Sequence, residues 1–137
     1  VKESSTDIAS ISAMTGGASQ YLKATGFGFA LPANAVVGGI YAQWERKSLS
    51  AVGLMDNAVR IVKDGVVQSE DRSGQDEWSE SYEVHTYGGA SDQWGVPWTA
   101  ADINSSGFGA ALSVKYVSRA GNDWPTVRDV ALSVCYQ

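Results

Sequence analysis

The chain has 137 residues, of which 44% are hydrophobic and 18% charged, and its net charge is −5. This length and composition fit one folded domain with its own core, and they exclude a disordered or membrane-embedded chain. The negative charge argues against a nucleic-acid partner, because phosphate binding requires clustered Lys and Arg. The one cysteine, Cys135, allows no internal disulfide. The chain begins at Val1, so we expect either removal of an initiator Met or cleavage of a precursor.

Residues 1–20 differ from the rest of the chain, because they are rich in Ser, Thr, Ala and Gly. One interpretation is an ordinary first strand with frayed ends. The other is an arm that pairs with the sheet edge of a neighbouring subunit through Ile8, Ile11 and Met14. We expect residues 21–137 to form the folded domain, and we predict that the arm contacts a neighbour.

Apolar and polar residues alternate with a period of two along most of the remaining sequence, which is typical of half-buried strands. The Asp64–Gly65 pair predicts a tight hairpin after the strand at 56–63. Pro32, Ala33 and Asn34 are expected to end a strand that carries Phe27, Phe29 and Leu31 on one face. The other predicted strands cover residues 36–47, 81–87, 108–116 and 129–136.

These patterns predict seven or eight short strands in an all-β, antiparallel two-sheet sandwich. We favour a jelly-roll-like topology over an immunoglobulin-like one, because the Cys–Trp–Cys arrangement of true immunoglobulin domains is missing. Thr99 and Asp102 have the spacing of a capping box, which predicts one helical turn before Ile103. Asp102 is therefore interpreted as a structural residue.

Four tryptophans are candidates for stacking on sugar rings: Trp78, Trp94, Trp98 and Trp124. Trp94 and Trp98 flank Gly95–Val96–Pro97, and exposed aromatic rings at such spacing could bind a glycan. The alternative is that these rings are buried and close one end of the sandwich.

Six blocks of the chain, taken in order, resemble a domain found among virion structural proteins of tailed phages and environmental viruses. The blocks are "YLKATGFGFALP", "IYAQWERK", "DNAVRIVKDG", "YGGASDQWG", "WTAADINSSGFGAALSV" and "VRDVALSVCY", and they span Tyr21 to Tyr136. The last block departs from the family pattern, since Arg128–Asp129 and Cys135 stand where the family has Val-Asp and Tyr. The resemblance implies a β-sandwich and a structural role in a tail or capsid decoration, without an active site.

Residues that could carry chemistry are few. His85, the one histidine, falls in a predicted strand with Glu83 and Tyr87 on its side, and we expect that side to face solvent. The acidic run at 69–83 offers Asp71, Asp76 and Glu77 as candidate Ca²⁺ ligands, although the EF-hand spacing is missing. The alternative is a solvated acidic loop. One His and one Cys cannot supply a zinc site. We therefore expect neither an enzyme nor a cofactor.

The resemblance therefore implies a non-enzymatic virion structural protein, in capsid decoration or a tail, that binds copies of itself and other virion proteins. It would be located at the virion surface or outside cells. Two alternatives are a subunit of an extracellular filament joined by N-terminal strand exchange, and a carbohydrate-binding module that recognises a surface glycan.

Overall fold

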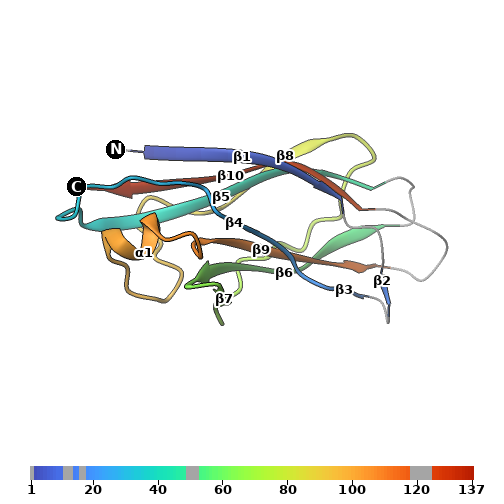
Figure 1. Ribbon diagram of the computed structural model, residues 1–137. Helices are drawn as coiled ribbons and strands as arrows, with labels where there is room; N and C mark the ends of the chain where they lie inside the picture. The colour runs from blue at the N-terminus through green and yellow to red at the C-terminus, as the bar shows by residue number, and fades with distance from the viewer. Residues whose placement is uncertain (1, 11–13, 16–17, 49–52, 118–124) are drawn as a thin grey trace.

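The computed structural model describes residues 2–10, 14–15, 18–48, 53–117 and 125–137. The chain forms two antiparallel sheets that pack face to face (Figure 1). Sheet A has the strand order β1 (Lys2–Ser10), β10 (Thr126–Tyr136), β5 (Val37–Lys47) and β8 (Glu83–Gly88). Sheet B has the order β2 (Met14–Thr15), β3 (Ala18–Ser19), β9 (Gly109–Tyr116), β6 (Leu54–Lys63) and β7 (Val66–Val67), and β4 (Leu22–Thr25) also pairs with β9.

The chain passes from one sheet to the other at most of its long connections. It enters sheet A at β1, moves to sheet B for β2–β4, returns for β5, and then alternates through β6–β7, β8, β9 and β10. Spatial neighbours are therefore seldom consecutive in sequence, as in jelly rolls. The predicted all-β, antiparallel two-sheet sandwich of jelly-roll-like type is confirmed.

The core lies between the two sheets and follows the alternation of the sequence. On β5, Ile40, Ala42 and Trp44 point inward and are 2% exposed or less. Val59 and Ile61 of β6 in the other sheet are fully buried. The neighbouring positions 41, 43 and 45 are partly exposed. The half-buried strands predicted at 36–47 and 56–63 are thus confirmed.

The hairpin predicted at Asp64–Gly65 joins β6 to β7. Both residues have left-handed backbones, with φ of 52° at Asp64 and 77° at Gly65. This is the conformation that a two-residue type I′ turn requires, and Asp-Gly favours it.

The strand predicted across Phe27 to Leu31 does not form. Gly26 and Gly28 both have φ of 75°, which turns the backbone out of the extended conformation. Phe29 and Leu31 still reach the core and are buried. The alternation was therefore correct about burial and wrong about secondary structure.

The one helix in the described part of the chain is α1 (Ala100–Asn104), and the capping box predicted for it is present. The backbone amide of Thr99 donates to Asp102 Oδ2 at 2.8 Å, and the amide of Asp102 donates to Thr99 Oγ1 at 3.2 Å. Ile103 is buried, so the turn places an apolar side chain in the core.

The N-terminal segment lies beside β10 in this structure. β1 pairs antiparallel with β10 from Lys2, opposite Cys135, to Ser10, opposite Thr126, and the register shifts between Asp7 and Ala9. Ile8 falls within β1, Met14 within β2, and Ile11 outside the described residues. Their role in assembly stays a prediction.

Replacing the N-cap hydroxyl tests whether the capping box holds α1 in place. Thr99→Ala is expected to lower the free energy of unfolding by about 0.5–2 kcal/mol, because the amide of Asp102 loses its acceptor. Thr99→Ser keeps the hydroxyl and is the matched control. Urea denaturation measures both, and an equal loss in the two variants would contradict the capping role.

Candidate functional site

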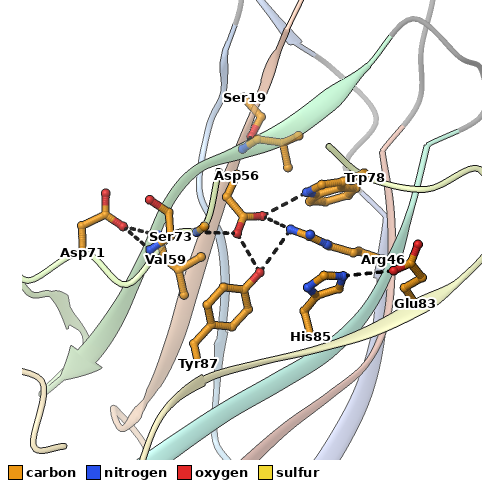
Figure 2. Close-up of polar contacts among 12 residues, drawn as sticks. Ser19, Arg46, Asp56, Val59, Asp71, Ser73, Trp78, Glu83, His85 and Tyr87 are labelled. Carbon is orange, nitrogen blue, oxygen red and sulfur yellow. Dashed lines mark hydrogen bonds and ion pairs between the residues drawn. The ribbon is translucent and has the colours of Figure 1, made fainter. Parts of the chain in front are cut away.

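A fully buried carboxylate, that of Asp56, lies at the centre of Figure 2. Its Oδ1 accepts hydrogen bonds from Arg46 Nη1 at 2.6 Å and from Trp78 Nε1 at 3.0 Å. Its Oδ2 accepts from Tyr87 Oη at 2.7 Å and from the backbone amide of Gly74 at 3.2 Å. Four donors therefore surround one carboxylate.

These groups come from both sheets and from the segment between them. Arg46 is on β5 and Tyr87 on β8, both in sheet A, whereas Asp56 is on β6 in sheet B. Trp78 and Gly74 belong to the connection between β7 and β8. The Asp56 cluster, as we call these five residues, is thus a polar link across the interior of the sandwich.

Burial sets the chemistry of the Asp56 cluster. The side chain of Arg46 is 2% exposed and that of Asp56 0% exposed, so neither can meet a substrate from solvent. Burial, together with the negative charge of Asp56, raises the pKa of Tyr87 far above its ordinary value. The phenol therefore stays protonated and remains a donor. The guanidinium of Arg46 also lies 5.2 Å from the centre of the Trp78 ring, within the range of a cation–π contact.

The sequence contains a signal for this cluster in the inward-facing residues of β5. Arg46 continues the series of Ile40, Ala42 and Trp44, where a charge requires a buried partner. Arg46 and Asp56 are only 10 positions apart, on consecutive strands of opposite sheets. Period-two alternation shows which side of a strand each residue lies on, but it does not show which strands pack against each other. The pairing of Arg46 with Asp56 could therefore not be derived from the sequence.

A second polar cluster orders the loop that follows β8. Arg72 donates to both oxygens of Asp92, at 2.8 and 3.0 Å, and to Glu70 at 2.9 Å. Asp92 Oδ1 also accepts from the backbone amide of Trp94 at 2.8 Å. Trp94 has φ of 57°, a conformation that bulky residues rarely adopt. Its fully buried ring and the 2.9 Å bond from its Nε1 to the carbonyl of Ile40 hold it there.

The positions of the described tryptophans do not fit the hypothesis that they bind sugar. Trp94 is 0% exposed and Trp78 is 4% exposed, so neither ring presents a face to a glycan. Trp98 is partly buried, packs edge-on against Phe108 at 5.3 Å and donates to the carbonyl of Gln93. Trp124 lies outside the described residues. The interpretation of Trp94 and Trp98 as closing one end of the sandwich agrees with these positions.

The candidate calcium ligands are not brought together. Among the described residues, no three His, Cys, Asp or Glu side chains form a group that could hold a metal ion. Asp71 accepts hydrogen bonds from the backbone amides of Val59 and Ser73, both at 2.9 Å, and the bond from Val59 anchors the acidic segment to β6. Asp76 and Glu77 are exposed.

The expectation that the His85 side of its strand faces solvent is wrong for Tyr87, which is only 8% exposed. This side of β8 faces the sandwich interior, where Tyr87 joins the Asp56 cluster (Figure 2). The side chain of His85 is 27% exposed, and its Nε2 lies 3.6 Å from Glu83 Oε2.

Two further features lie at the surface. On sheet A, the Arg128 guanidinium stacks on Tyr82 at 3.6 Å and donates to Glu45 at 2.7 Å. A groove of about 380 Å³ lies beside the end of β10 and has no charged side chain in its lining, which consists of Val36, Gly38, Ala90, Cys135, Tyr136 and Gln137. Neither feature combines a nucleophile with a base, so neither geometry points to catalysis.

Comparisons of the chain with family models, with curated proteins and with solved structures returned no match. In the part of the chain that the structure describes, no helix has the length and apolar character needed to cross a membrane. The assignment of a function therefore depends on the fold, the surfaces and the sequence.

Removing the buried carboxylate tests how much the Asp56 cluster contributes to the free energy of unfolding. Asp56→Ala is expected to cost about 3–5 kcal/mol of unfolding free energy, because it leaves the Arg46 charge buried without a partner. Glu70→Ala, which breaks a half-exposed ion pair with Arg72, is the control and is expected to cost less than about 1 kcal/mol. Similar small losses in the two variants would show that the cluster is dispensable.

The pair of Arg72 and Asp92 predicts a pH dependence. Hydrogen bonds from Arg72 lower the pKa of Asp92 against the opposing effect of partial burial. Such a carboxylate stabilises the fold fully above its ordinary pKa of about 3.9, and the contribution is lost as the pH falls through the lower folded value. Asp92→Asn should therefore be less stable than the parent at neutral pH, and the gap should shrink below about pH 4. A gap that is constant with pH in urea titrations would refute the assignment.

Proposed function

We propose that the chain is a non-enzymatic structural subunit of a virion, in a capsid decoration or a tail, that works through contacts with copies of itself and with other virion proteins. Two observations support this role. The jelly roll is an architecture of viral capsid domains, although lectin domains also use it. The polar clusters of the described residues are interior or loop-ordering contacts and offer no reactive centre.

The observation that carries the proposal is the pairing of β1. The register sets Glu3 opposite Val134, Ser5 opposite Leu132 and Asp7 opposite Val130. These three residues of β10 are core residues, and all are at most 4% exposed. At these three positions the β1 sequence has no apolar residue, whereas Ala9 is the register partner of Val127, which is also buried.

We therefore expect backbone hydrogen bonds to contribute most to the attachment of β1 over this stretch. β10 can form the same backbone hydrogen bonds with the β1 of another copy, because strand pairing at a sheet edge depends on the backbone more than on side chains. Exchange of an identical element between subunits links copies at little cost in stability. The N-terminal strand would join subunits in this way, a mode that would also serve an extracellular filament.

One substitution turns the native cysteine into a test of strand exchange. Lys2 is the register partner of Cys135, and directly opposed residues of antiparallel strands lie within disulfide range. Lys2→Cys, oxidised at high protein concentration, should give covalent dimers and larger species on a non-reducing gel. Lys2→Cys in a Cys135→Ser background is the matched control and should stay monomeric.

An internal disulfide, with the protein remaining one chain in size, would contradict strand exchange.

The virion placement has its own test, which is quantitative mass spectrometry of purified particles. A structural subunit is expected there in many copies per particle, and its recovery only from the particle-free fraction would overturn the placement.

A further inference from the structure

The second edge of sheet A is formed by β8, at the other end of the strand order from β1. β8 pairs with β5 on one side, from Tyr41 opposite Gly88 to Arg46 opposite Glu83. On its other side, the described residues provide no strand partner. An open strand edge is a template for another strand, and proteins usually protect it with charge, Pro or a bulge. β8 carries one exposed charge, Glu83, whose side chain is 53% exposed, and next to it an exposed apolar residue, Val84, which is 52% exposed.

We propose that β8 pairs antiparallel with β8 of a second copy of this chain, with Val84 at the twofold axis. In this register Val84 opposes Val84 of the partner copy. Glu83 then opposes His85 of the partner copy, and the same contact occurs a second time by symmetry. A twofold interface of this kind is self-complementary, as isologous contacts must be.

The side chains of β8 favour this register over its neighbours. Glu83 and His85 lie on the same side of β8, with Glu83 Oε2 3.6 Å from His85 Nε2 (Figure 2). Both side chains are therefore placed for a carboxylate–imidazole contact across the axis. An axis at His85 would oppose two imidazoles and set Val84 against Thr86. An axis at Thr86 would set Val84 against Gly88. Only the axis at Val84 combines an apolar cross-strand pair with donor–acceptor pairs on both sides.

This inference deepens the proposed function and rests on it, because it names the partner at the edge that β1 leaves free. Exchange of β1 at one edge and β8 pairing at the other would extend sheet A through successive copies. The two contacts use different strands, so variants can remove one and leave the other.

A cysteine at the proposed axis tests the pairing directly. In a Cys135→Ser background, Val84→Cys should form a disulfide-linked dimer under mild oxidation, because the two introduced thiols would be directly opposed. Thr86→Cys is the matched control. Position 86 is also exposed on β8, but its register partner in the other copy is Tyr82, which leaves the two introduced thiols about 13 Å apart along the strands. This control should remain monomeric.

Efficient dimerisation of Val84→Cys but not of Thr86→Cys would support the proposal. Absence of the disulfide-linked Val84→Cys dimer at protein concentrations of about 0.1–1 mM, or equal dimerisation of both variants, would overturn it. Unchanged tryptophan fluorescence of each variant shows that the fold is retained.

Charge reversal gives an independent readout without oxidation. Glu83→Lys and His85→Glu should each weaken the dimer in sedimentation velocity, and the double variant should restore it, because each new lysine faces a new glutamate. If the double variant is as weak as the singles, the register is wrong.

The Lys2→Cys variant separates the two proposals. In one outcome, β8 pairing is lost, but the disulfide between Cys135 and the cysteine introduced at position 2 still links different chains. This outcome would overturn the β8 inference alone. Loss of that disulfide between chains, with β8 pairing retained, would overturn strand exchange and leave the β8 interface standing.

Discussion

The buried ion pair between Arg46 and Asp56 is the contact on which the arrangement of the other parts depends. Burying a charge is costly unless the charge is paired and hydrogen-bonded, and Asp56 of sheet B takes its partners from sheet A and from the segment between β7 and β8. Tyr87 and Trp78 must both reach this carboxylate. These contacts attach β8 and the connection that precedes it to β6 of the opposite sheet.

The two edges of sheet A have different chemistry. At the β1 edge, Glu3, Ser5 and Asp7 are the register partners of buried apolar residues of β10, and Ala9 is the partner of buried Val127. β8 is anchored by the inward-pointing Tyr87, while Val84 remains exposed at the free edge. The first edge is suited to exchanging a strand, and the second to accepting one. The proposed structural role would use these two edges to join copies of the chain.

Local patterns in the sequence predicted the strands, the hairpin at Asp64–Gly65 and the capping box at Thr99, because each depends on neighbouring residues. The predicted strand through Phe27 was wrong because glycines with positive φ interrupt it. Alternation of apolar and polar residues does not reveal the sign of φ. Burial of Trp78 and the partnership of Arg46 with Asp56 depend on which sheets face each other. Those contacts are set by topology, so a one-dimensional pattern could not give them.

Assembly through the two edges of sheet A is the central claim, and amide hydrogen exchange at low and high protein concentration tests it most directly. The free-edge amides of an open strand exchange with solvent, and pairing with another chain protects them. Raising the concentration is expected to add protection in β8 and in the paired strands β1 and β10, with the rest of the sandwich unchanged. Identical exchange at both concentrations, or added protection confined to sheet B, would contradict it.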